Sequence, residues 1–199
     1  MSRLLVIEAS PQRDQSVSRQ LTARFVAKWR RAHPQGEVVT RDLDAMGVPF
    51  IDMAWIAGAF SPPETHSPES AAAMKLSDDL ITELQAASHI LIGIPMHNLM
   101  IAAPLKAYID QIVRVGATVT AGNVGMVTDK KAAVLLASGG DFSPGAPAER
   151  FNHATPYLRA VLGFIGISDL QFILAGPTRP VAMGELGIHD FIARFEPDI

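Results

Sequence analysis

Five short runs of apolar residues along the chain predict β-strands. We place them at Leu4–Glu8, Val38–Leu43, His89–Ile94, Ala132–Ala137 and Leu170–Ala175. Three of the runs are almost continuous in Val, Ile, Leu and Ala. This composition is typical of strands that are covered on both faces, as in a parallel sheet. The pattern therefore predicts a buried sheet.

Amphipathic patterns lie between these strands and predict helices. In the first of them, Val17, Leu21, Phe25 and Trp29 recur every four residues and give a helix one apolar face. Similar stripes occupy residues 76–84, 105–112 and 157–162. Strands that alternate with helices predict a doubly wound α/β fold with helices on both faces of the sheet. For five strands the common order is 2-1-3-4-5, which places ligands at the carboxyl ends of the strands.

One segment, residues 46–68, does not follow this alternation. It contains four prolines together with the bulky apolar residues Phe50, Trp55, Ile56 and Phe60. Because a linker would not need such side chains, we expect an ordered excursion that packs on the body or on a partner subunit. Its composition suggests that Trp55 or Phe60 shapes a substrate slot.

Composition limits the class of protein. The chain has 199 residues, of which 48% are hydrophobic, and this size suits a single domain over residues 1–199. A net charge of -3 argues against a nucleic-acid partner. No apolar stretch approaches the ~20 residues of a membrane span, and the N-terminus lacks a signal-peptide pattern. We therefore expect a cytoplasmic protein without membrane contact.

The loop after the first strand is rich in hydroxyl groups and leads into a helix at Ser16-Val17-Ser18. A helix N-terminus presents unpaired N–H groups, and it attracts anions. Ser16 is therefore either a helix cap alone or part of a phosphate site that also uses Ser10 and Ser18. The loop lacks the glycines of a dinucleotide fingerprint, and the chain has no Walker motif. A single phosphate monoester fits this loop best.

Two further loops follow predicted strands and could approach a flat ring. We expect Pro95 to end the third strand, so that Met96, His97 and Asn98 offer backbone and amide groups to the ring's polar edge. Met96 could instead fill the core, and His97 could be an ordinary surface residue. Gly139-Gly140 allows a close approach of backbone, or it is a simple turn. FMN combines one phosphate with a planar ring.

Other chemistries find no support in the sequence. The chain has no cysteine, which excludes disulfides and thiolate nucleophiles. Its six histidines are scattered without the spacing of metal ligands, so no metal site is expected. No G-x-S-x-G motif of a serine hydrolase is present.

Three segments carry a family resemblance: IEASPQRDQSVSRQL, GIPMHNLMIAAPLKAYIDQIVRVGATV and PYLRAVLGFIGISDLQFILAG. Together they resemble the bacterial FMN-dependent NADH:quinone oxidoreductases, also called azoreductases. The resemblance implies a flavodoxin-like fold and a homodimer with one FMN per subunit at the interface. It also implies two-electron, ping-pong transfer from NADH or NADPH to quinones or azo compounds, with the hydride carried by the flavin and no catalytic side chain.

The same resemblance assigns roles to residues. It places the FMN phosphate at Ser10, Ser16, Val17 and Ser18, the ring at Met96, His97, Asn98 and Leu99, and the pyrimidine edge at Ser138, Gly139 and Gly140. Phe164 is implied to line the substrate side, as Trp55 is expected to do from composition. The chain departs from the family at His97, where tyrosine is frequent, and at Ser138, where arginine is frequent. The last helix, within residues 181–199, also looks weak.

Two other functions remain open from the sequence. An electron carrier or redox sensor would bind FMN without turning over a nicotinamide, although carriers that dock on charged partners are usually more strongly charged. A non-enzymatic dimer that has lost its cofactor is the third possibility.

Overall fold

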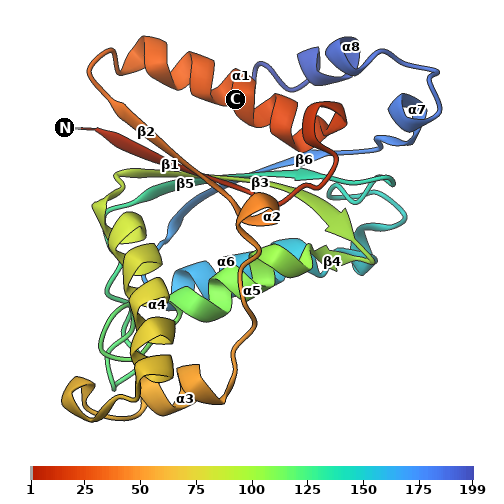
Figure 1. Cartoon of the computed structure of the whole chain (residues 1–199). Coiled ribbons are helices and arrows are strands. Elements are labelled where there is room, and N and C mark those ends of the chain that lie inside the picture. Colours follow the sequence, from red (N-terminus) through yellow and green to blue (C-terminus); the bar gives the residue numbers. More distant parts are fainter. Residues whose placement is uncertain (1) are drawn as a thin grey trace.

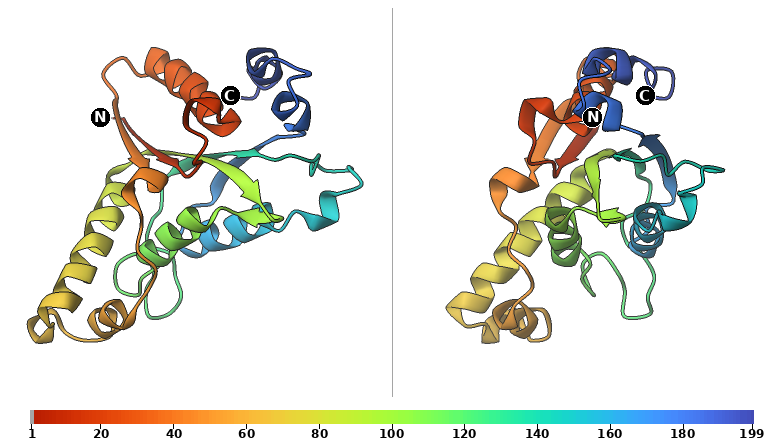
Figure 2. Two further views of the ribbon diagram at one scale, coloured as in Figure 1. Left: turned by 45° about the vertical axis from the view of Figure 1, so that its right-hand side comes forward. Right: turned by 90° about the vertical axis from the view of Figure 1, so that its right-hand side faces the viewer.

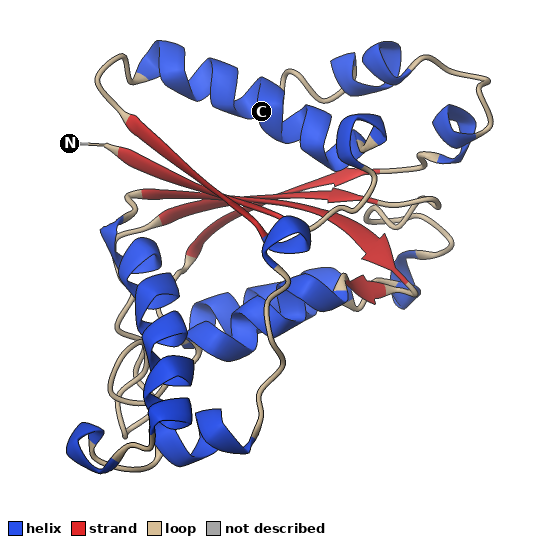
Figure 3. Ribbon diagram, viewed as in Figure 1, coloured by secondary structure: helices blue, strands red, loops and turns tan. Residues whose placement is uncertain are grey.

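The computed structural model describes residues 2–199. A twisted parallel sheet forms its centre, in the order β2-β1-β3-β5-β6 (Figures 1 and 3). The strands are β1 (Arg3–Glu8), β2 (Glu37–Asp42), β3 (His89–His97), β5 (Lys131–Ala137) and β6 (Asp169–Ala175). Counted in chain order, these five strands have the predicted order 2-1-3-4-5, which is confirmed.

The third strand is longer than predicted. Pro95 does not end it: β3 continues to His97, and the chain then turns back into β4 (Met100–Ile101), which pairs antiparallel with it. Pro95 is tolerated because it pairs with Ala137, the last residue of β5. The N–H that proline lacks is therefore missing only at the end of that ladder.

The second strand has the predicted length but lies one residue earlier: it runs from Glu37 to Asp42, so it ends at Asp42 rather than Leu43. The Asp42 carboxylate accepts hydrogen bonds from the N–H groups of Asp44 and Ala45, and so caps the short helix α2 (Leu43–Met46). Leu43 is fully buried as the first residue of that helix. An aspartate cap thus converts the end of an apolar run into a helical turn.

Helices cover both faces of the sheet (Figure 2). One face carries α1 (Val17–Ala32), α7 (Arg179–Ala182) and α8 (Ile188–Ala193); the other carries α4 (Pro68–Ala86), α5 (Ala103–Ile112) and α6 (Ala154–Phe164). β1 divides its side chains between two cores, with Leu4 and Val6 on the α1 side and Leu5 and Ile7 on the other. This alternation is that of a strand buried on both faces.

Residues 46–68 form α3 (Met53–Ala59) and the 3-10 turn η2 (Pro63–Thr65). Further 3-10 turns are η1 (Arg13–Gln15) and η3 (Glu149–Phe151). α3 packs against α4, and a Cβ on Gly58 would lie 2.6 Å from Met74 Cγ, so the two helices approach closely. Within residues 2–199, no helix is long and apolar enough to cross a membrane.

Candidate functional site

The loops after β1 and β5 and the last residues of β3 meet at one edge of the sheet and line a cavity of about 220 Å³. We call it the strand-end cavity. Eight of the predicted residues line it: Ser10, Ser16, Val17, Ser18, Met96, His97, Ser138 and Gly139. The sequence therefore identified residues from three separate loops that the fold brings together.

The N-terminus of α1 forms one wall of this cavity. Ser16 is the N-cap, and its Oγ accepts a hydrogen bond from the N–H of Arg19 at 3.3 Å. The hydroxyl oxygens of Ser16 and Ser18 lie 3.1 Å apart, and both residues are buried. The N–H groups of Val17 and Ser18 belong to the first turn, where no helical carbonyl can accept from them. Capping and anion binding are thus compatible in this turn.

The arginines near this turn are already paired. Arg13 contacts Asp44 at 3.2 Å, and Arg19 contacts the carboxylates of Glu8 and Asp42 at 2.8 Å each. An anion in the cavity would therefore be held by hydroxyl and backbone donors rather than by an unpaired cation.

The turn between β3 and β4 has an unusual backbone. Asn98 and Leu99 have φ angles of 48° and 70°, which lie in the left-handed region. Two such residues in succession make the type of turn that suits a tight hairpin, and asparagine adopts it more easily than leucine. The carbonyl of Leu99 is fixed by the N–H of His153 at 3.1 Å. A strained but anchored turn therefore follows His97, although neither Asn98 nor Leu99 lines the strand-end cavity.

The loop after β5 is held by hydrogen bonds of Ser138 and is open at Gly139. Ser138 Oγ donates to the carbonyl of Gly140 at 2.9 Å, and the Ser138 carbonyl accepts from the N–H of Thr178 at 2.8 Å. A Cβ on Gly139 would meet no atom within 4 Å. By contrast, a Cβ on Gly176 would lie 2.5 Å from the Gly140 oxygen. This backbone can be approached closely from the Gly139 side only.

A second cavity of about 560 Å³, which we call the side cavity, lies beyond the β3–β4 turn. It is lined by His97 and Asn98, and also by Phe50 and Lys106. Sequence reasoning did not select Phe50 as a site residue, although it stood out as a bulky apolar residue of segment 46–68. Its side chain is 76% exposed, so it is available to contact a ligand or a partner.

Two predicted substrate-lining residues lie elsewhere. Trp55 is 9% exposed in α3, which packs against α4, and it lines neither the strand-end cavity nor the side cavity. Phe164 ends α6 with 43% of its side chain exposed and also lines neither of them. Trp55 is therefore largely buried in this chain, and its role in shaping a substrate slot stays a prediction.

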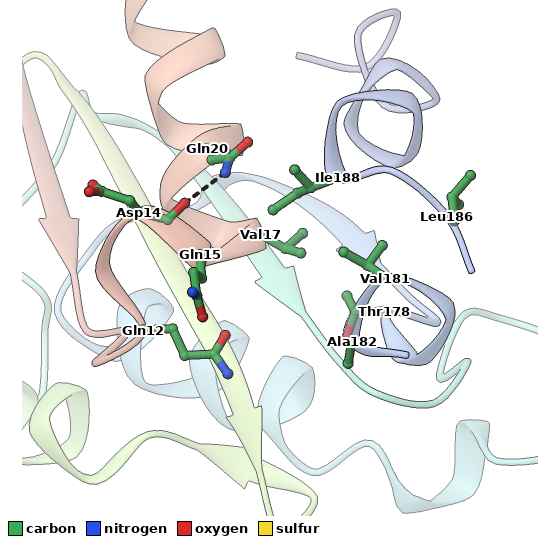
Figure 4. A pocket seen from close by; sticks show the side chains of 10 residues that line it. All are labelled: Gln12, Asp14, Gln15, Val17, Gln20, Thr178, Val181, Ala182, Leu186 and Ile188. Carbon is green, nitrogen blue, oxygen red and sulfur yellow. Dashed lines mark hydrogen bonds between the residues drawn. The ribbon is translucent and has the colours of Figure 1, made fainter. Parts of the chain in front are cut away.

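A third cavity, of about 530 Å³, lies between the start of α1 and the α7–α8 segment (Figure 4). It shares Gln12, Val17 and Thr178 with the strand-end cavity. The C-terminal segment that looked weak in the sequence is anchored here, since Phe191 and Ile192 of α8 are buried in the same core as α1. The N-terminal turn of α1 is thus bordered by the C-terminal part of the chain.

Comparisons with known proteins identify the family and the fold. A family model described as a flavodoxin-like fold matches residues 2–196. An FMN-dependent NADH:quinone oxidoreductase of Nostoc punctiforme is 45% identical, over 98% of this chain and all of that protein. Another from Burkholderia lata is 43% identical over the whole chain and 95% of that protein. The crystal structure of an azoreductase from Bacillus anthracis superposes with a TM-score of 0.86 at 29% identity, covering 100% of this chain and 96% of that one.

Proposed function

This chain belongs to the family of FMN-dependent NADH:quinone oxidoreductases with a flavodoxin-like fold, and from that premise we propose how it acts. It is an oxidoreductase that uses FMN and passes two electrons, as hydride, from NADH to quinones or azo compounds. We propose a ping-pong order, in which the nicotinamide leaves before the acceptor binds. Neither the relatives nor the described residues favour an electron carrier or sensor instead.

The residues present fit FMN. The cavity offers buried serine hydroxyls and first-turn N–H groups at the start of α1, which suit one phosphate monoester. Gly139 leaves open space in front of its backbone, as a flat ring requires. We assign the phosphate to Ser10, Ser16, Val17 and Ser18, the ring to Met96, His97, Asn98 and Leu99, and its pyrimidine edge to Ser138, Gly139 and Gly140.

Bound FMN would supply the hydride chemistry, and the chain supplies binding and orientation. The α1 turn fixes the phosphate end of the cofactor. The anchored β3–β4 turn and the Ser138–Gly140 backbone orient hydrogen-bonding groups toward the ring. Because both backbones are restrained by contacts from behind, they present donors and acceptors with little reorganisation.

We place the electron acceptor over the side cavity. Phe50 offers an aromatic surface there, while His97 and Asn98 add polar groups beside the ring site. An apolar and planar acceptor such as a quinone or azo compound suits this combination. His97 in place of the family's frequent tyrosine makes this wall more polar.

We also propose a homodimer with the FMN sites at its interface, in the cytoplasm, where NADH is produced and consumed. Support comes from the exposed apolar side chains on and near α3, which are Phe50, Met53, Ile56 and Phe60. They lie close in sequence, and Phe50 borders the side cavity. In such a dimer, half-exposed Phe164 would reach the partner's substrate side.

The visible absorption spectrum tests this function. Purified protein is mixed with FMN and then given NADH without oxygen, followed by a quinone. We expect a bound-flavin spectrum that bleaches with NADH and returns with the quinone. A bound flavin that NADH cannot bleach would instead establish a carrier or sensor, and protein that binds no flavin would overturn the proposal.

A further inference from the structure

Arg19 connects the N-terminal turn of α1, where we place the phosphate, with the neighbouring segments of the chain. Its side chain is 14% exposed. Nε donates to the Ser10 carbonyl at 2.9 Å, Nη1 donates to both Glu8 and Asp42 at 2.8 Å, and Nη2 donates to Asp42 at 2.8 Å. One planar guanidinium thus joins the end of β1, the following loop, the end of β2 and α1 itself.

Each of the two carboxylates also accepts a hydrogen bond from a group other than Arg19. Asp42 receives two bonds from Arg19 and also caps α2, and Glu8 accepts from the hydroxyl of Thr22 as well. The hydrogen bonds from Arg19 hold the pKa of Asp42 below its usual range. The positive charge of Arg19 is therefore paired with these two carboxylates, and Arg19 does not line the strand-end cavity.

We propose that Arg19 is a positioning residue for the phosphate monoester of the cofactor, which it does not touch. It fixes the Ser10 loop against the first turn of α1. It also offsets part of the negative charge of Glu8 and Asp42, both of which it pairs with. This inference rests on the proposed FMN function and adds how the site tells a flavin phosphate from the unphosphorylated flavin.

Loss of the Arg19 guanidinium would change two features of this turn. Ser10 then loses the donor that holds its carbonyl, and the carboxylates of Glu8 and Asp42 lose the cation that pairs with both of them. Both changes weaken binding of the phosphate. The residues assigned to the flavin ring lie at the ends of β3 and β5, and they stay in place. Charged hydrogen bonds of this kind are stronger than neutral ones, so the effect is expected to be large.

The test compares FMN with riboflavin, which lacks the phosphate, by quenching of flavin fluorescence. For Arg19→Met we expect about tenfold or greater loss of FMN affinity and about twofold or smaller change for riboflavin. The FMN loss should shrink as salt is raised, because salt screens the repulsion. Arg19→Lys keeps the charge and should recover part of the affinity. Arg24→Met is the matched control, since Arg24 lies on α1 in an exposed pair with Glu196.

Equal losses for FMN and riboflavin, or unchanged FMN affinity, would overturn the role of Arg19. If Arg19→Met does not fold, Glu8→Gln/Arg19→Gln replaces it; this pair keeps the net charge of the cluster and should still lose FMN selectively through the freed Ser10 loop. Failure of the wild-type protein to bind FMN would overturn the proposed function, whereas normal wild-type binding with an unaffected variant overturns this inference alone.

Discussion

At the scale of single residues, the site depends on side chains that have two roles at once. Ser16 caps α1 and also faces the strand-end cavity. Ser18 is buried, and its hydroxyl lies within hydrogen-bond distance of the Ser16 hydroxyl. A cap contributes to folding in any helix, so only a ligand measurement separates the two roles.

Replacing both serines in Ser16→Ala/Ser18→Ala should raise the dissociation constant of FMN about tenfold or more, because two hydroxyl groups no longer contact a charged phosphate. Loss of the cap should also cost about 1 kcal/mol of unfolding free energy. Fluorescence titration and urea unfolding measure the two effects. Ser67→Ala removes the cap of α4 and should reproduce only the loss of stability. An unaltered FMN dissociation constant would show that capping is the only role of the pair.

Gly176 tests the loop after β5 in the same way. In Gly176→Ala the new Cβ would meet the Gly140 oxygen and Ser138 Oγ, at 2.5 and 2.7 Å, so the loop must move. We expect a loss of about 1–3 kcal/mol in stability and weaker FMN binding. Gly163→Ala, in α6 with no atom within 4 Å of its Cβ, should instead leave FMN binding unchanged. FMN binding that is equal in both variants would remove the loop from the site.

At the scale of elements, Asp42 joins the end of β2, the start of α2 and, through Arg19, helix α1. Its carboxylate accepts from Arg19 through both oxygens, and this pairing requires the ionised form. The structure thus fixes three element ends through one charged group, whose folded-state pKa is lowered.

Asp42→Asn should therefore destabilise the protein in a pH-dependent way, by about 1–3 kcal/mol near pH 7. Because the pKa of Asp42 is lower in the folded state, its contribution is complete above the unfolded-state pKa and is lost as pH falls through the folded value. The stability difference from wild type should thus narrow below about pH 4. Urea unfolding at several pH values measures it. A difference that stays constant would contradict the ionic role; Asp79→Asn, in an exposed pair with Lys75, serves as control.

At the scale of the whole molecule, the exposed apolar residues around α3 support the proposed dimer. Phe50 and Phe60 are 76% and 82% exposed. Soluble monomers seldom present such side chains close together, whereas interfaces often do. This is the basis for placing the second subunit here.

Phe50→Ser/Phe60→Ser should shift the protein from dimer to monomer. Each phenylalanine contributes about 2 kcal/mol when buried, so the dimer dissociation constant should rise at least about a hundredfold. Sedimentation velocity over a range of concentrations measures this. Met183→Ser removes an exposed apolar side chain next to α7 and should have no effect. A wild-type protein that sediments as a monomer would contradict the dimer itself.

The sequence by itself determined the sheet order and most of the predicted residues that line the strand-end cavity. Its apolar runs and helical stripes are strong because strands buried on both faces leave no polar positions, and such runs leave few alternative arrangements. The same topology brings the loops of Ser16, Met96 and Ser138 to one edge, as expected. The family resemblance added the cofactor and its assignment to these residues.

Only the tertiary structure decided the remaining features. Pro95 gave the wrong end for β3, because its effect depended on which residue of β5 lies opposite. Trp55 and Phe50 are both bulky aromatic residues of segment 46–68, and the sequence does not distinguish them. In the folded chain Trp55 is buried in α3, which packs on α4, whereas Phe50 is exposed beside the side cavity. The contacts of Arg19 have no signal in the local sequence, because the fold brings its partners to it from β1 and β2. Local pattern records burial and periodicity, whereas contacts between distant segments exist only once the chain has folded.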